Sequence, residues 1–171
     1  MNFMKKVALS FVAMIGLVFS ANAQKTIVDI AVGSADHTTL VAAVKAADLV
    51  ATLQSAGPFT VFAPNNAAFA KLPAGTVAYL LKPENKATLA KVLTYHVVAG
   101  KFLAADVLKA ISSSNGNLTL KTVSGGSLSV SIRDGKVILK DEKGGVSTVL
   151  VTDLVAGNGV IHGIDSVVLP N

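Results

Sequence analysis

The sequence predicts an α+β fold in which helices come first and antiparallel strands follow. Up to about Ser112 the apolar residues recur at helical spacing, with one apolar strand inserted. After that point apolar and polar residues alternate, as they do in half-buried strands. An Asp134-Gly135 pair lies between two alternating runs, where it favours a tight hairpin. Because helices and strands are segregated rather than interleaved, we do not expect a doubly wound parallel sheet.

Short polar residues that can accept backbone N–H bonds mark where the first helices begin. Thr26 precedes a short apolar run, and Thr38 or Thr39 precedes apolar positions at helical spacing over 40–53. The Gly57-Pro58 pair cannot continue a helix and ends the second one. The sequence therefore predicts two helices before this pair.

An apolar run, Phe59-Thr60-Val61-Phe62, predicts a strand that is buried on both faces. Pro64 ends the strand, and Asn65 or Asn66 can cap a short helix that turns Phe69 back onto the core. Further helices are predicted at 77–81, 86–94 and 103–110.

The second part of the chain reads as strands separated by glycine-rich turns. Both central residues of a type I′ turn need a positive φ, which Asp134-Gly135 tolerates, so the sequence predicts a hairpin here. The other turns are predicted at 124–127, 144–145 and 157–159. The strands are predicted at 118–123, 128–133, 136–139, 146–151 and 159–169.

Residues 1–23 have the features of a cleavable export signal. Lys5 and Lys6 precede an uncharged run over 7–19, and Ala21-Asn22-Ala23 supplies the small residues that signal peptidase requires. The alternative is a membrane anchor, but a run of this length spans only about 20 Å of a bilayer core of about 30 Å. We therefore expect secretion across the inner membrane, to the periplasm or the exterior. Residues 24–171 are then expected to form a single domain without a membrane span.

The composition excludes some classes of function. The formal net charge is +5, but the charges are scattered and do not alternate with aromatic residues, so nucleic-acid binding is not expected. The sequence has no cysteine, which excludes disulfides and attachment of a lipid to a cysteine. A domain of this length can rely on its apolar core instead.

Motifs of common enzymes do not occur in the sequence. It has no Gly-x-Ser-x-Gly elbow, no phosphate-binding loop and no dinucleotide fingerprint. His37, His96 and His162 are far apart and have no cysteine beside them, so no metal site is predicted. Asp153 and Asp165 each lie in an apolar run, and we favour backbone N–H bonds at strand ends over a chemical role. We predict a protein that is not an enzyme and has neither cofactor nor metal.

Three segments, in order, resemble the signatures of fasciclin-like domains. They run over 57–69, 93–100 and 158–170, and the resemblance covers nearly all of residues 24–171. The chain thus looks like a secreted bacterial single-domain fasciclin protein, with Asn65 in place of the usual Thr. The residues that match the first and last signatures are Thr60, Phe62, Pro64, Asn66, Phe69, Asn158, Gly159, His162 and Asp165.

The resemblance implies a wedge-shaped, twisted β-sandwich of about seven strands, flanked by a helical layer from the first half of the chain. It also implies that the first and last signature segments lie side by side. Most of the signature residues are core residues, so they identify the fold and say less about activity.

The resemblance further implies a non-enzymatic adhesion module. In animal members of the family, integrin contacts are assigned to a Tyr-His segment and to an Asp-Ile pair. Those positions correspond here to Tyr95, His96, Asp153 and Leu154, with Leu in place of Ile. Bacteria have no integrins of their own, so a structural role is favoured for these residues, with the Tyr95 ring buried and His96 bonded in a strand.

The expected function is therefore a secreted module for contacts at a cell surface, a matrix or a biofilm. Its partners would be proteins or polysaccharides, and a monomer is expected. The alternative is a periplasmic or extracellular binding protein for a small molecule or a polysaccharide, although the lack of Trp disfavours a platform for stacking sugars. An enzyme is the third and least favoured reading.

Overall fold

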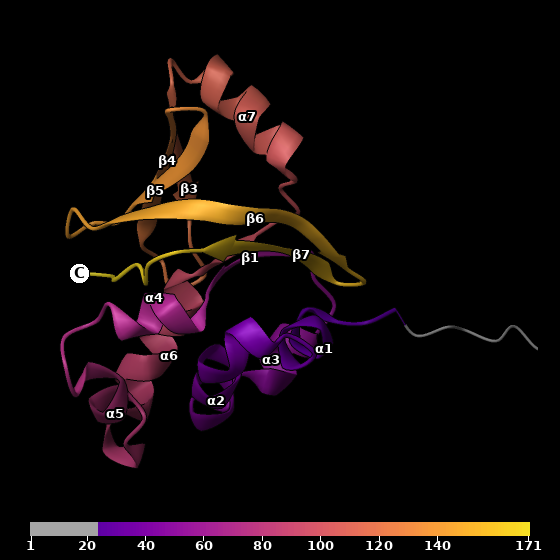
Figure 1. The fold of residues 1–171 in the computed structure, drawn as a ribbon. Helices are drawn as coiled ribbons and strands as arrows, with labels where there is room; N and C mark the ends of the chain where they lie inside the picture. The colour runs from indigo at the N-terminus through magenta and orange to yellow at the C-terminus, as the bar shows by residue number, and fades with distance from the viewer. Residues whose placement is uncertain (1–23) are drawn as a thin grey trace, which may run out of the picture.

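A curled seven-stranded sheet and a layer of helices make up the fold (Figure 1). The computed structural model describes residues 24–171, and the export signal predicted for residues 1–23 lies outside them. In Figure 1 helices α1 to α6 lie on one side of strands β1, β6 and β7, while β3 to β5 and helix α7 lie on the other side. This arrangement confirms the predicted α+β class.

The strands follow the order β2-β1-β7-β6-β5-β4-β3 in the sheet. The long strand β6 joins the two halves, because its first residues pair with β5 and its later residues pair with β7. A bridge between Val98 and Thr122 brings the two outermost strands together, so the sheet curls into a sandwich that is nearly a barrel. The strands are β1 (Phe59–Pro64), β2 (Val97–Ala99), β3 (Asn117–Lys121), β4 (Ser127–Arg133), β5 (Lys136–Lys140), β6 (Val146–Ala156) and β7 (Gly159–Ile164).

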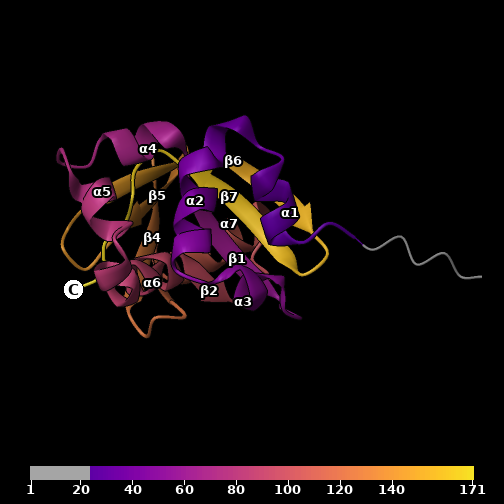
Figure 2. The ribbon, with the colours of Figure 1, turned by 90° about the horizontal axis from the view of Figure 1, so that it is seen from below.

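The helices of the first half cover the outer face of β1 and β7, as the view from below shows (Figure 2). None of the helices within residues 24–171 is both long and apolar enough to cross a membrane. The helices are α1 (Ile27–Val32), α2 (Thr38–Ala46), α3 (Val50–Gln54), α4 (Asn66–Ala70), α5 (Thr76–Leu80), α6 (Lys86–Tyr95) and α7 (Ala104–Ser113).

Strands β1 and β7 pair in parallel at the centre of the fold. Their register runs from Phe59 opposite Gly159 to Pro64 opposite Ile164. The first and last signature segments are therefore direct neighbours, as the resemblance implied. Parallel strands need a long connection between them, and here that connection contains every element from α4 to β6.

Two apolar cores lie on opposite faces of this central pair. The first fills the space between the helical layer and the sheet and includes Ile27, Leu40 and Leu93. The second lies inside the curled sheet under α7 and includes Phe62 and Ile111. Because β1 and β7 have a core on each face, most of their residues are apolar on both faces, and the exceptions are Thr60 and His162.

Several local predictions are confirmed. Thr26 forms a capping box with Asp29, and the side chain of Asn65 accepts the Ala68 N–H at the start of α4. Asp134 and Gly135 both have positive φ in the β4–β5 hairpin. These features depend on neighbours in the sequence, which makes them predictable.

Other predictions were wrong about where helices and strands begin and end. The helix expected over 40–53 is two helices, because the chain turns at Asp48, whose φ is +60°. Strand β6 is longer than expected and β7 ends at Ile164 rather than at residue 169. His96 is not a strand residue, since it follows the last residue of α6 as its C-cap.

Candidate functional site

The side chain of Tyr95 lies wholly inside the curled sheet. Its hydroxyl donates to the Ser127 carbonyl oxygen at 2.6 Å and accepts the Glu142 N–H at 3.2 Å. Burial raises the pKa of Tyr95, and this outweighs the opposite effect of the Glu142 N–H bond. The residue thus ties α6 to the β3–β4 and β5–β6 turns, and its hydroxyl does not reach the surface.

His96 is also buried, and both of its ring nitrogens have partners. Nδ1 lies 2.8 Å from the Val92 carbonyl oxygen and Nε2 lies 3.2 Å from the Val168 nitrogen. A carbonyl only accepts and a backbone N–H only donates, so the ring is neutral with its proton on Nδ1. Burial lowers the pKa of His96 to about 4, which agrees with a neutral ring.

His162, from the last signature, packs on Phe62 from the first. The two rings are stacked with centroids 5.7 Å apart. The His162 Nε2 lies 2.7 Å from the Phe102 carbonyl oxygen, and Nδ1 accepts the Asp153 N–H at 3.3 Å. His162 therefore links β7 to the segment before α7 and to the middle of β6.

Thr60 and Asn158 use their side chains to join distant segments. The Thr60 hydroxyl donates to the Gly100 carbonyl oxygen at 2.7 Å and accepts the Phe102 N–H at 2.9 Å. The Asn158 oxygen accepts the Ile27 N–H, and its amide nitrogen donates to the carbonyl oxygens of Leu53 and Ser55. Asn158 thereby fixes the β6–β7 turn against α1 and α3.

The Asp165 carboxylate holds the end of β7 against β6. Its Oδ1 accepts the Thr148 N–H at 2.8 Å, as predicted for this residue, and Lys71 lies 3.5 Å from Oδ2. Burial alone would raise the pKa of Asp165, but the hydrogen bonds from Thr148 and Ser166 and the charge of Lys71 leave it below its usual range. Asp165 is therefore ionised and structural at neutral pH.

The remaining signature residues lie where β1 meets α4. Pro64 ends β1, and Phe69 packs into the core of the helical layer. Asn66 caps a neighbouring helix: its Oδ1 accepts the Thr39 N–H at 3.0 Å and its Nδ2 donates to the Ala35 carbonyl oxygen. Neither Thr38 nor Thr39 caps α2 with its own side chain, so that prediction was wrong.

Asp153 and Leu154, unlike Tyr95 and His96, lie at the surface in the second half of β6. Asp153 has a φ of +59°, and its register with β7 is irregular. Its Oδ1 accepts the Ala104 N–H at 2.8 Å, so it does bind a backbone N–H, but from an exposed position within the strand. The structure thus separates the four candidate contact residues into a buried pair and an exposed pair.

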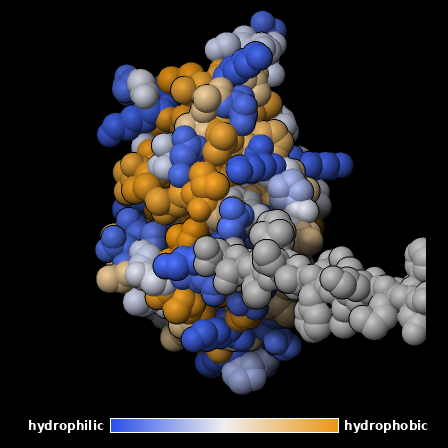
Figure 3. Space-filling model, turned by 90° about the vertical axis from the view of Figure 1, so that its right-hand side faces the viewer, coloured by the Kyte–Doolittle hydropathy of each residue, from blue (hydrophilic) through white to orange (hydrophobic). Residues whose placement is uncertain are grey.

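Apolar side chains surround the exposed pair. Leu150, Val151, Leu154 and Val155 are all exposed, Leu150 by 53% and Val155 by 54%, and we call these four residues the β6 strip. Figure 3 looks at this end of the molecule, where apolar side chains gather on the left part of the face. Single exposed apolar residues are ordinary, but a contiguous group of them marks an interaction surface.

The outer edge of β6 is also free along the strip. Strand β5 pairs with β6 only at Val146–Thr148, whereas β7 pairs with the other edge as far as Ala156. The register shifts on either side of Val151 break the usual alternation, which explains why neighbouring residues are exposed together. The site therefore combines an apolar surface with a strand edge that no other described strand occupies, where an extended chain can bind.

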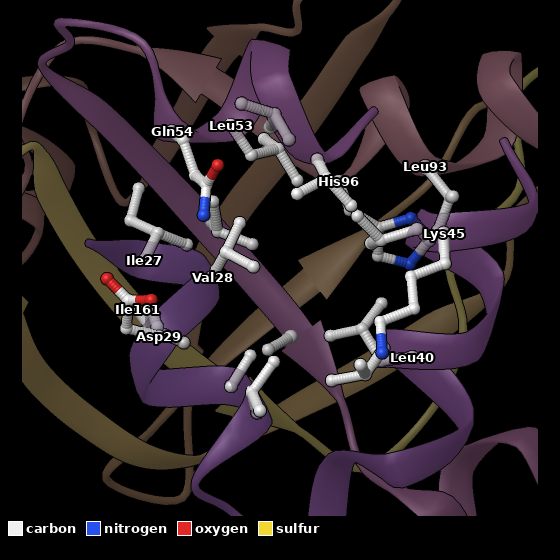
Figure 4. A pocket seen from close by; sticks show the side chains of 18 of the residues that line it. Ile27, Val28, Asp29, Leu40, Lys45, Leu53, Gln54, Leu93, His96 and Ile161 are labelled. Carbon is white, nitrogen blue, oxygen red and sulfur yellow. The ribbon is translucent and has the colours of Figure 1, made fainter. Parts of the chain in front are cut away.

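A second feature is a cavity of about 220 Å³ in the helical layer (Figure 4). Protein interiors hold few voids larger than a water molecule, because an empty apolar cavity costs roughly 24 cal/mol per Å³. The walls come from α1, α2, α3, α6, β1, β2 and β7, and fifteen of the nineteen lining residues are apolar. The polar ones are Asp29, Lys45, Gln54 and His96.

Sequence analysis missed both the cavity and the β6 strip. The apolar residues that form the cavity walls have the same sequence pattern as other core residues. Lys45 is a single lysine on a helix, so no local pattern in the sequence indicates the cavity or its cation. The run from Val149 to Val155 is apolar enough to suggest a buried strand, and only the sheet order leaves it uncovered. Within residues 24–171 no three His, Asp or Glu side chains come together as metal ligands.

Comparison with known proteins identifies relatives in Synechocystis. Residues 35–170 match the family model described as the Fasciclin domain. Protein sll1483 of Synechocystis sp. is 52% identical over 145 residues, which cover 85% of this chain and 73% of that protein. The uncharacterized protein sll1735 of the same organism is 46% identical over 143 residues, covering 84% of this chain and 96% of that protein.

The fold itself also has a counterpart among solved structures. A FAS1 domain pair from the insect cell adhesion molecule Fasciclin I superposes with a TM-score of 0.74 at 20% sequence identity. The match covers 85% of this chain and 51% of that chain, and it concerns the fold alone. With a family model that spans most of its length and a fold that agrees, this chain belongs to the Fasciclin domain family.

Proposed function

We propose that the protein is a secreted, non-enzymatic interaction module that attaches to proteins at a cell surface, in a matrix or in a biofilm. The observation that carries this proposal is the β6 strip, an exposed apolar surface beside a free strand edge.

The occupant of the strip is an extended segment of a partner protein. An added strand would pair along the edge of β6 that no described strand occupies, which gives affinity, while its side chains would contact Leu150, Leu154 and Val155. Burial of apolar surface contributes about 25 cal/mol per Å² to such a contact. A polysaccharide offers neither the regular N–H donors nor the apolar side chains that this surface fits.

Export places the module outside the cytoplasm in this proposal. The signal peptide over residues 1–23 would deliver residues 24–171 to the periplasm or the exterior, where attachment is useful. A monomeric domain without a cysteine suits that route, because it folds without oxidation. Asp153 and Leu154 belong to the contact surface, whereas Tyr95 and His96 support it from within.

Attachment of purified protein to the cells that produce it tests the proposal. In the double variant L150S/V155S two exposed side chains of the strip lose their apolar character, so we expect at least a tenfold loss of cell-bound protein at constant fold. The control is I132S, since Ile132 is 44% exposed on β4 and lies outside the strip. Circular dichroism and melting temperature establish that all variants are folded.

Two treatments of the cells and one sedimentation measurement then identify the partner. Protease treatment of the cells should abolish attachment, and glycosidase treatment should leave it unchanged. Attachment that survives protease but not glycosidase would overturn the protein partner. A wild-type protein that sediments as a dimer, while L150S/V155S sediments as a monomer, would instead make a second copy the occupant.

A further inference from the structure

We propose that the cavity in the helical layer binds a small apolar molecule that carries an anionic group, such as a medium-chain carboxylate. This site lies among α1, α2 and α3 on the face of β1 and β7, away from the β6 strip. It goes beyond the proposed attachment function and does not depend on it.

The size of the cavity sets the size of the ligand. An engineered apolar cavity of about 150 Å³ stays dry and binds benzene. Because benzene has six carbon atoms, scaling by volume predicts that a cavity of about 220 Å³ holds a ligand of about eight or nine carbon atoms. The walls are side chains of Val28, Leu40, Val44, Leu53, Val61 and Ile161, which offer only apolar contact.

The polar groups around the cavity set the charge of the ligand. Asp29 and Lys45 lie on opposite sides of it (Figure 4). The Asp29 carboxylate already accepts the Thr26 N–H at 2.8 Å and its hydroxyl at 2.7 Å, as part of the capping box. Among the described residues Lys45 has neither an ion pair nor a side-chain hydrogen bond, so its ammonium group remains available for an anion.

His96 also lines the cavity, but its ring nitrogens are not available to bind a ligand. Both ring nitrogens are bonded within the fold, to the Val92 carbonyl oxygen and the Val168 N–H. Besides the Gln54 amide, the recognition elements that remain are an apolar chamber and one cation, Lys45. A carboxylate with a short aliphatic or aromatic body satisfies both.

A series of straight-chain carboxylates tests the size prediction. Butyrate, hexanoate, octanoate, decanoate and dodecanoate are titrated by calorimetry and by methyl NMR, below the concentrations at which they aggregate. Burying one methylene is worth about a fourfold gain in affinity. We expect that gain for each added carbon up to about nine carbons and a plateau beyond. A steady rise through dodecanoate would indicate non-specific binding and overturn the proposal, as would no binding of octanoate.

Two variants with matched controls test the location and the charge. A31L fills the cavity from α1 and should weaken octanoate binding at least tenfold, while A42L, on the exposed face of α2, should not. K45M should weaken octanoate about three- to fivefold but leave 1-octanol unchanged, whereas K136M should alter neither. Unchanged octanoate binding by A31L would rule out the cavity, and equal effects of K45M on both ligands would rule out the anionic group.

The β6 strip variant separates this inference from the attachment function. L150S/V155S should bind octanoate as tightly as the wild type. If that variant lost octanoate binding too, the ligand would be held at the strip and the cavity assignment would be overturned. Failure of the attachment assay alone would leave the carboxylate results unaffected.

Discussion

Buried polar side chains in this protein act as ties between distant segments. Thr60, Tyr95, His96 and His162 each bond with the backbone of another part of the chain. An unpaired buried polar group costs about 1–3 kcal/mol, so each tie also fixes the geometry of its neighbours. The residues that identify the family therefore stabilise the fold, and the effect of replacing them can be measured as a change in the free energy of unfolding.

The pH dependence of stability is the first residue-scale prediction. The pKa of His96 is about 4 in the folded protein and about 6.5 in the unfolded chain, so folding favours the neutral ring. This stabilisation is fully present above pH 6.5 and is lost as the pH falls toward 4. It amounts to about 3 kcal/mol.

The variant H96Q isolates that effect, because glutamine does not titrate. We expect the unfolding free energy of the wild type, minus that of H96Q, to fall by most of this amount between pH 7 and pH 4. Urea denaturation followed by circular dichroism provides both values. A difference that stays constant with pH would mean that His96 is solvated in the folded protein.

The second residue-scale prediction concerns the Tyr95 hydroxyl. Y95F leaves the Ser127 carbonyl oxygen and the Glu142 N–H without their partner, so we expect a loss of about 1–3 kcal/mol of unfolding free energy. The control Y79F removes a hydroxyl from a side chain that is 55% exposed and should change stability by less than about 0.5 kcal/mol. Equal effects of the two substitutions would refute a structural role for this hydroxyl.

Among the helices and strands, short sequence patterns predicted where an element begins better than they predicted how long it is. Thr26 and Asn65 cap the helices that follow them, so their roles can be predicted from short sequence spacing. Thr38 and Thr39 have the same chemistry but do not cap, because Asn66 from another helix takes that role. A bond that reaches across 27 residues leaves no local pattern.

The cap that Asn66 provides for α2 gives a prediction about helix stability. N66A removes the acceptor for the Thr39 N–H and the donor to the Ala35 carbonyl oxygen. We expect a loss of about 1–2 kcal/mol in thermal or chemical unfolding. T39A leaves the Thr39 N–H bonded and should cost less than half as much. If T39A were the more damaging, the cap would belong to α2 itself.

At the scale of the whole molecule, the order of the strands determines features that could not be predicted from the sequence. The composition and periodicity of the chain predicted helices, strands and their order, and the family resemblance supplied the pairing of β1 with β7. The cavity and the β6 strip arise only when the sheet order places some strands against others. Neither depends on residues that are close in sequence, so neither could be predicted from spacing.

The junction of β1 and β7 gives the whole-molecule prediction. A Cβ at Gly159 would overlap the Phe59 carbonyl oxygen, whereas a Cβ at Gly163 would meet the Val151 side chain at an ordinary 3.4 Å. We expect G159A to lose more than about 3 kcal/mol of stability or to fail to fold. G163A should remain within about 1 kcal/mol of the wild type. Equal tolerance at both positions would contradict the parallel register.

Site-specific photocrosslinking tests the central claim, contact through β6, most directly. A photoreactive benzophenone side chain replaces either Leu154 in the strip, which is 36% exposed, or Tyr79 on α5, which is 55% exposed and so more accessible. After illumination with the producing cells, we predict protein adducts of higher mass from position 154 and only background from position 79. Adducts that form equally at both positions, or at position 79 alone, would contradict attachment through the β6 strip.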